Sequence, residues 1–141
     1  MDTCLEKGEI LVVDDDSLMR ELLVDVLSSE GFEVRSAANG RLAIQSVATL
    51  PPHMILMDIN MPGMDGIEVL RRLKAQEVNF SIPLILVSGT RKTDEMMEGL
   101  TLGAVDFIQK PYRIADLLKR IRTHLPPIRR RDRAAGRTFD Q

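Results

Sequence analysis

The chain has 141 residues and a mass of 15.8 kDa, with 44% apolar and 28% charged residues, which suits one globular domain with a single core. Five arginines and two aspartates give residues 126–141 a net charge of +3, which leaves −5 for residues 1–125 out of a total of −2. The body of the chain should therefore repel phosphate and nucleic acid on average. The lone Cys4 excludes an internal disulfide, and no apolar run approaches the roughly 18 residues of a membrane helix. We expect a cytoplasmic protein without membrane attachment.

Five short apolar runs, each followed by apolar residues at helical spacing, divide the chain into five strand–helix units. The expected strands are residues 9–13, 32–37, 54–57, 83–87 and 105–108. Helical spacing follows them from Leu18, Leu42, Ile67, Met96 and Ile114. This alternation predicts an α/β fold, with a five-stranded parallel sheet covered by helices on both faces. Residues 32–37 alternate apolar and polar side chains, as a half-exposed edge strand does.

The five units place one domain at residues 9–125. We interpret residues 1–8 as an N-terminal extension and residues 126–141 as a basic tail or linker remnant. The arginine-rich part of this tail could contact nucleic acid, but it has no interleaved aromatic residues and follows a Pro-Pro pair. We therefore expect a solvated linker there, and no nucleic acid binding by the domain itself.

Polar side chains stand where the expected strands end. The first strand runs into three acids, Asp14, Asp15 and Asp16; the third ends at Asp58, the fourth at Ser88, and the fifth is followed by Lys110. Ligands of parallel sheets bind outside the carboxyl ends of the strands, so these side chains should converge there. Any one acid or serine could instead serve a turn or a helix end, and for Asp16 we expect a helix N-cap.

Acidic side chains gathered at one edge repel one another unless a cation lies among them. Neither cysteine nor histidine is available at the strand ends, since His53 opens the third strand and His124 lies late in the last helix. We expect both histidines to be ordinary surface residues. An all-oxygen set of ligands favours a hard ion such as Mg²⁺.

A carboxylate beside Mg²⁺, a lysine and a hydroxyl together provide the groups needed to accept a phosphoryl group. Asp58 would attack in line, Lys110 would neutralise the phosphoryl oxygens, and Ser88 would donate a hydrogen bond to one of them. A general base is not required, because a carboxylate is ionised near neutral pH. We therefore expect a phosphoacceptor rather than an enzyme that turns over a free substrate.

Four segments of the chain resemble the receiver domain of two-component response regulators, in particular the chemotaxis regulators. They are ILVVDDD at 10–16, MDINMPGMDG at 57–66, LVSGT at 86–90 and GAVDFIQKPY at 103–112. The four segments occur in the family's order and spacing, and the resemblance covers residues 9–125. It implies a flavodoxin-like, doubly wound fold with strand order 2-1-3-4-5.

The resemblance also implies roles for individual residues. Asp58 would be phosphorylated by a sensor histidine kinase or a histidine phosphotransfer protein. Mg²⁺ would be held by Asp15, Asp58 and the main-chain carbonyl of Asn60, with Asp14 acting through a metal-bound water. The peptide bond before Pro111 would be cis.

A conformational switch is the further implication of the family. Ser88 would move to the phosphoryl group, and the side chain of Phe107 would enter the vacated space. This movement would remodel the face formed by the fourth helix, the fifth strand and the fifth helix, where a target protein or a second copy of the chain would bind.

Four positions concern how this chain would differ in behaviour from other receivers. Phe107 stands where many relatives have tyrosine, which keeps the volume but removes the hydroxyl. Gly89 should leave access to Asp58 open, and Asn60 and Thr90 occupy the positions that tune how long the phosphoryl group survives.

The strongest alternative is a haloacid-dehalogenase-type phosphatase, with Asp14 as nucleophile, Asp16 as acid, and Ser88 and Lys110 as phosphate ligands. The chain lacks the further acidic pair that such a phosphatase needs for its metal, and this interpretation leaves residues 57–66 unexplained. Nucleotide binding is weaker still, because neither glycine-rich phosphate-binding motif is present. A receiver-like interaction module that is never phosphorylated would not need the complete set of acids, serine and lysine. The sequence specifies neither the kinase, the target nor an output domain.

Overall fold

A computed structural model describes residues 5–76, 79, 81–89, 93–125 and 128–129. Five parallel strands form the central sheet: β2 (Glu9–Val13), β3 (Glu33–Ala37), β4 (Met54–Asp58), β5 (Leu84–Ser88) and β6 (Asp106–Gln109). Their order across the sheet is β3-β2-β4-β5-β6. Counted along the chain within this sheet, this is the order 2-1-3-4-5 expected from the family resemblance, which confirms the fold. Each strand begins and ends within one residue of its predicted bounds.

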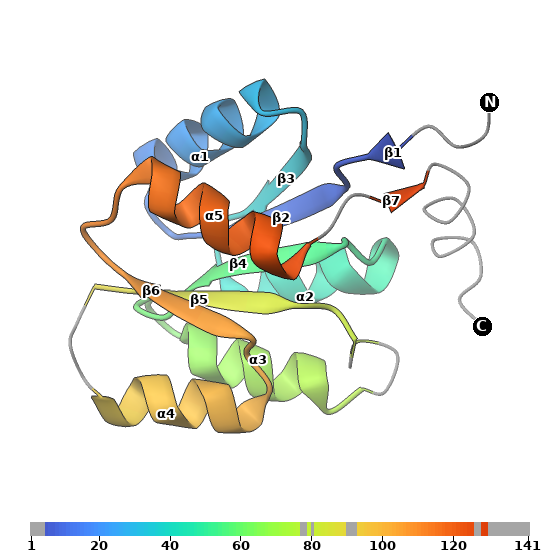
Figure 1. Ribbon diagram of the computed structural model, residues 1–141. Coiled ribbons are helices and arrows are strands. Elements are labelled where there is room, and N and C mark those ends of the chain that lie inside the picture. Colours follow the sequence, from blue (N-terminus) through green and yellow to red (C-terminus); the bar gives the residue numbers. More distant parts are fainter. Residues whose placement is uncertain (1–4, 77–78, 80, 90–92, 126–127, 130–141) are drawn as a thin grey trace.

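Helices cover both faces of the sheet (Figure 1). The helices are α1 (Ser17–Ser29), α2 (Gly40–Thr49), α3 (Gly66–Lys74), α4 (Thr93–Leu102) and α5 (Ile114–His124). α1 and α5 lie on one face, and α2, α3 and α4 lie on the other (Figure 1). In β2, for example, Ile10 and Val12 pack with α1 and α5, whereas Leu11 and Val13 pack with α2 and α3. A strand buried on both faces reads as a continuous apolar run, which is the pattern of residues 9–13.

Side chains of the connecting loops fix where three of the helices begin. Asp16 caps α1 by accepting hydrogen bonds from the N–H groups of Leu18 and Met19, as predicted. Asn39 and Asp65 cap α2 and α3 in the same way. Each cap satisfies N–H groups that have no partner within the helix, so these helices start directly after the strand ends.

Gly66 lets α3 begin against the end of β4. Its N–H donates to the carbonyl oxygen of Ile59 at 2.9 Å. A Cβ at this position would lie 2.4 Å from the carbonyl oxygen of Asp58 and 2.8 Å from Cα of Ile59. Because these neighbours are main-chain atoms that cannot rotate away, glycine is required for this close approach.

A second, two-stranded sheet joins the segments before and after the central domain. β1 (Leu5–Glu6) pairs antiparallel with β7 (Ile128–Arg129). Figure 1 shows this pair away from the carboxyl ends of the central strands. Neither strand could be predicted from the sequence, because two residues are too few for a periodic pattern. The assignment of residues 1–8 and 126–141 as separate extensions stays a prediction.

Lys7 fixes the path of the chain between the two sheets. Its ammonium donates to the carbonyl oxygen of Glu30 at the C-terminal end of α1 and lies 5.6 Å from the centroid of the Phe32 ring. A cation at a helix C-terminus and over an aromatic face is favourable in both places. The N-terminal segment is thereby attached to the α1–β3 connection.

Each of the two histidines contacts another residue through its ring. His53 Nδ1 accepts a hydrogen bond from the N–H of Glu9 at 3.0 Å, and His124 Nε2 lies 3.1 Å from Asp106 Oδ2. Both side chains are half-buried rather than fully on the surface, and neither belongs to the acidic cluster at the strand ends. None of the helices in the described ranges is long and apolar enough to cross a membrane.

Candidate functional site

Asp58 and Asp14 are buried carboxylates at the ends of neighbouring strands. Each residue is only 3% exposed, although it follows a run of apolar residues. Asp58 Oδ1 accepts a hydrogen bond from the N–H of Asn60 at 3.3 Å, and Asp14 Oδ1 accepts one from the N–H of Asp16 at 2.9 Å. β2 and β4 are neighbouring strands, so the two carboxylates lie side by side at the carboxyl ends of these strands.

Asp15 completes an acidic cluster with these two residues. Asp14, Asp15 and Asp58 can each offer one carboxylate oxygen, and the three oxygens lie within 4.8 Å of one another. Two of the residues are buried, and Asp15 is exposed. The donors are all oxygen atoms, and one of them opens to solvent, which fits a hard divalent cation that keeps part of its water shell.

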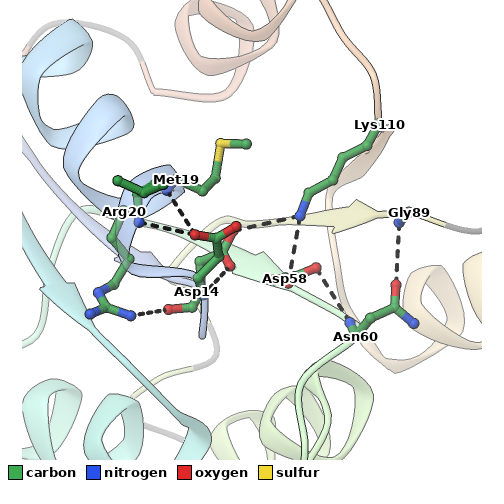
Figure 2. A network of polar contacts seen from close by, with 9 residues as sticks. Asp14, Met19, Arg20, Asp58, Asn60, Gly89 and Lys110 are labelled. Carbon is green, nitrogen blue, oxygen red and sulfur yellow. Dashed lines mark hydrogen bonds and ion pairs between the residues drawn. The ribbon is translucent and has the colours of Figure 1, made fainter.

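Lys110 brings a positive charge to the cluster from β6. Its Nζ lies 3.6 Å from Asp14 Oδ2 and 3.7 Å from Asp58 Oδ2, so one ammonium pairs with both buried carboxylates (Figure 2). The N–H of Lys110 also donates to the carbonyl oxygen of Ser88 at 2.7 Å, which ties the end of β6 to the end of β5. The Lys110–Pro111 bond is cis, as the resemblance implied.

The surroundings of Asp58 raise its pKa from 3.8 to about 6. Burial is the largest cause, and the charges of Asp14 and Asp15 act in the same direction. The ammonium of Lys110 and the N–H of Asn60 oppose the rise by stabilising the charged form. At neutral pH Asp58 is therefore still mainly ionised, but burial and the neighbouring acids make its negative charge less favourable than in water.

Ser88 is buried at the end of β5, directly beyond the residue that pairs with Asp58. Ser88 therefore ends its strand at the same end of the sheet as the acidic cluster. Phe107, in β6, is half-buried and packs against the apolar cluster under α2 and α3. The structure thus places both residues where the sequence predicted them, whereas their movement stays a prediction.

The side chain of Asn60 makes a contact that was not predicted from the sequence. We expected its main-chain carbonyl to be the functional group, but its side-chain Oδ1 accepts a hydrogen bond from the N–H of Gly89 at 3.2 Å (Figure 2). The two residues lie in different loops, so no local pattern could indicate the bond. Thr90, a predicted influence on phosphoryl lifetime, lies outside the described residues.

Arg20 and Tyr112 are also close to the site, although neither was among the predicted site residues. Arg20 Nη1 donates to the main-chain carbonyl of Asp14 at 2.7 Å and so braces the turn between β2 and α1. The pKa of Tyr112 is raised by burial and, to a smaller extent, by the charges of Asp14 and Asp58. Its ring is therefore within electrostatic range of both buried carboxylates.

An apolar groove of about 510 Å³ opens beside Lys110. Its lining residues come from α1, from the connection between β6 and α5, and from the start of α5: Met19, Leu22, Lys110, Pro111, Tyr112 and Ile114. Leu18 at the start of α1 is 75% exposed, and Leu22 is 49% exposed. Leu22 thus contributes both to the groove and to the exposed apolar surface of α1.

Residues 10–122 match the model of the response regulator receiver domain. The DNA-binding response regulator MtrA of Mycobacterium tuberculosis is 38% identical over 125 residues, which cover 89% of this chain and 53% of MtrA. The chain thus spans about half the length of the curated relatives it matches.

Two solved structures have the same fold. The receiver domain of a signal transduction histidine kinase from Syntrophus aciditrophicus has a TM-score of 0.78 at 34% identity, covering 84% of this chain and 89% of that one. The chemotaxis protein CheY4 of Vibrio cholerae has a TM-score of 0.79 at 29% identity, covering 84% of this chain and 98% of that one. The sequence match, the strand order and the acidic edge agree: the chain belongs to the family of response regulator receiver domains, which act in two-component signalling.

Proposed function

We propose that Asp58 accepts a phosphoryl group from the phosphohistidine of a sensor histidine kinase or a histidine phosphotransfer protein. The observation that carries this proposal is the pairing of Lys110 with two buried carboxylates, Asp14 and Asp58, at the carboxyl end of the sheet. A carboxylate kept charged at a buried position is a typical feature of a reactive site rather than of a stable core.

The transfer needs only groups that the site contains. A carboxylate oxygen of Asp58 attacks the phosphorus, and a P–O bond forms as the P–N bond to the donor imidazole breaks, with the electron pair passing to the imidazole nitrogen. Lys110 balances charge on the phosphoryl oxygens, and the hydroxyl of Ser88 donates to one of them. Asp58 does not require a base, because it is mainly ionised above its pKa of about 6.

Mg²⁺ is the cofactor that suits the acidic cluster. Asp15, Asp58 and the main-chain carbonyl of Asn60 would hold the ion, with Asp14 acting through a bound water. When bound, the ion supplies positive charge that offsets the mutual repulsion of the carboxylates and the charge of the phosphoryl group. The all-oxygen cluster and its partial opening to solvent support this assignment.

The phosphodonor would dock on the apolar groove beside Lys110. Its phosphohistidine has to come within bonding distance of Asp58, so the surface around that histidine must cover the adjacent rim. Leu22 lines the groove and is exposed, and Leu18, which is also exposed, precedes it on α1. An apolar helix face of the donor would fit them.

The output would be a change of the α4-β6-α5 face. Ser88 and Phe107 would change position together, and a downstream protein or a second copy of the chain would bind the altered face. MtrA is longer than this chain, since the matched residues cover only 53% of it, and any activity of a further domain is a separate question. We also propose that the protein acts in the cytoplasm and that it does not turn over a free substrate.

Labelling with radioactive acetyl phosphate in the presence of Mg²⁺ tests the proposal. We expect label on the wild type and on Asp25→Ala, which removes an exposed acid of α1, and no label on Asp58→Ala. Equal labelling of Asp58→Ala would refute the role of Asp58. Multiple turnover of a phosphomonoester that is lost in Asp14→Ala but retained in Asp58→Ala would instead establish the phosphatase alternative.

A further inference from the structure

The side chain of Arg20 reaches back from α1 to the end of β2. Its Nη1 donates a hydrogen bond of 2.7 Å to the main-chain carbonyl oxygen of Asp14 (Figure 2). Asp14 donates its own N–H to the carbonyl oxygen of Ala37, the last residue of β3. In a continued parallel ladder, the N–H of Asn39 would donate to the oxygen of Asp14. Because β3 ends at Ala37 and Asn39 is the N-cap of α2, the guanidinium takes the place of that strand donor.

The hydrogen bond from Arg20 fixes a peptide plane inside the acidic cluster. A peptide unit is planar, so holding the carbonyl oxygen of Asp14 also determines where Cα of Asp15 lies. The N–H of Asp14 is bound to β3, and its Oδ1 accepts from the N–H of Asp16. The main chain and the side chain of Asp14 therefore both have partners, which define the path of the chain through the cluster.

Asp15 depends on this path more than the other two acids do. Asp14 and Asp58 are buried, so packed neighbours hold their carboxylates, whereas Asp15 is exposed. The three carboxylates nevertheless offer oxygens that lie within 4.8 Å of one another. An exposed carboxylate that two others repel can turn toward solvent unless its main chain is held. The position of Asp15 is thus the part of the cluster that needs support from the backbone.

We propose that Arg20 is a positioning residue of the cation site: its guanidinium fixes the peptide plane between Asp14 and Asp15 and so keeps the Asp15 carboxylate within reach of the ion. Arg20 acts through the backbone of the metal ligands and not through its charge, since a positive charge near the site disfavours a cation. This inference rests on the proposed function, and in particular on the proposed Mg²⁺ site.

The charge and the hydrogen bond of Arg20 have opposite effects on a bound cation. Loss of a positive charge beside three carboxylates strengthens cation binding, whereas loss of the hydrogen bond that positions a ligand weakens it. Arg20→Met separates the two effects, because methionine keeps much of the apolar stem and has no donor for the Asp14 carbonyl. We expect this variant to bind Mg²⁺ about tenfold more weakly than the wild type. Titration of the metal-free proteins with Mg²⁺, followed by NMR, measures both affinities.

Arg41→Met is the matched control, since Arg41 is an exposed arginine of α2. It removes the same charge at a solvated position, so Mg²⁺ affinity should stay within about twofold of the wild type. Arg20→Lys keeps a positive charge and a donor, and its affinity should lie between those of the wild type and Arg20→Met. Mg²⁺ binding by Arg20→Met that equals or exceeds that of the wild type would overturn the inference.

Amide exchange in the metal-free protein provides a second readout. The N–H of Asp16 donates to Asp14 Oδ1 at 2.9 Å, so its exchange should be faster in Arg20→Met as the turn loosens. Leu56, buried in the middle of β4, should exchange as in the wild type. Equal acceleration at both amides would show general destabilisation and would exclude the positioning role. If the wild type bound no Mg²⁺, or Asp58→Ala bound it as tightly, the proposed cation site itself would fail, and this inference with it.

Discussion

At the scale of single residues, the site is shaped by the conflict between burial and charge at Asp58. Burial raises its pKa to about 6, and Lys110 is the largest influence that opposes the rise. The unfolded chain has no such burial, so its Asp58 titrates near the ordinary value of 3.8. The folded, metal-free protein therefore binds a proton on Asp58 more tightly than the unfolded chain does, and this contribution to stability is lost as pH rises through about 6.

Asp58→Asn should remove this pH dependence in the presence of a chelator. At about pH 4 the carboxyl of the folded wild type is protonated, so the variant and the wild type should differ little in their free energies of unfolding. At about pH 7.5 the variant should be more stable than the wild type. The difference between their free energies of unfolding should be roughly 2–3 kcal/mol larger than at about pH 4, which corresponds to a shift of about two pKa units. Urea unfolding of both proteins at the two pH values measures the change. Asp25→Asn, at an exposed position, serves as the control, and a difference that does not vary with pH would contradict the assignment.

Lys110→Met tests the opposing charge, because methionine keeps much of the apolar stem and lacks the ammonium. The pKa of Asp58 should rise above about 6 in this variant, since the largest influence that lowers it is gone. NMR titration of the Asp58 carboxyl carbon in metal-free protein gives the value directly. A pKa equal to or below that of the wild type would show that Lys110 does not pair with Asp58 in solution.

At the scale of elements, the close approach of α3 to β4 determines where Asp58 and Asn60 lie. Gly66→Ala would drive a Cβ into the main chain of Asp58 and Ile59, and we expect a loss of about 1–3 kcal/mol or more in the free energy of unfolding. Acetyl phosphate labelling should fall as well, because the helix must move away from the site.

Gly63→Ala is the matched control for that variant. Gly63 lies in the loop that leads from β4 to α3 and has a φ of +78°. A Cβ there would meet nothing within 4 Å. Its only expected effect is the backbone strain of a left-handed alanine, about 1 kcal/mol, with labelling retained. Urea unfolding and labelling of the two variants separate strain from collision, and equal losses in both would contradict the packing argument.

The elements were predictable from the sequence because their apolar residues are periodic and their ends carry turn or capping residues. Asp16 could be assigned as a helix cap in this way, and the convergence of Asp14, Asp58 and Lys110 follows from the topology of a parallel sheet. The Asn60–Gly89 bond could not be predicted, since it joins side chain to backbone across 29 residues. Burial of Asp14 but exposure of Asp15 likewise depends on which way each side chain faces after the strand ends.

At the scale of the whole molecule, the charged site and the β1–β7 pair lie in different regions. The site is built at the carboxyl ends of β2, β4, β5 and β6. Lys7 and Gly8, which connect β1 to β2, lie at the opposite end of β2. The pairing of β1 with β7 uses residues from both ends of the chain, and no pattern within either segment could reveal it.

Deletion of residues 1–6 should separate these two regions experimentally. The variant loses β1, so amide exchange at Ile128 and Arg129 should become faster in hydrogen-exchange mass spectrometry. Labelling of Asp58 by acetyl phosphate should stay within about twofold of the full chain, because a two-residue pair contributes little to global stability. A large loss of labelling would mean that the N-terminal segment supports the site over the length of the domain.

The place of Tyr112 gives the protein an optical reporter of its own. The chain has one tyrosine and no tryptophan, and that tyrosine lies in the electric field of Asp14 and Asp58. Its emission therefore comes from one known position, on the rim that a phosphodonor would cover and beside the carboxylates whose charge a cation or phosphoryl group would change. Binding at this site should be visible as a change in intrinsic fluorescence, without any dye attached to the protein.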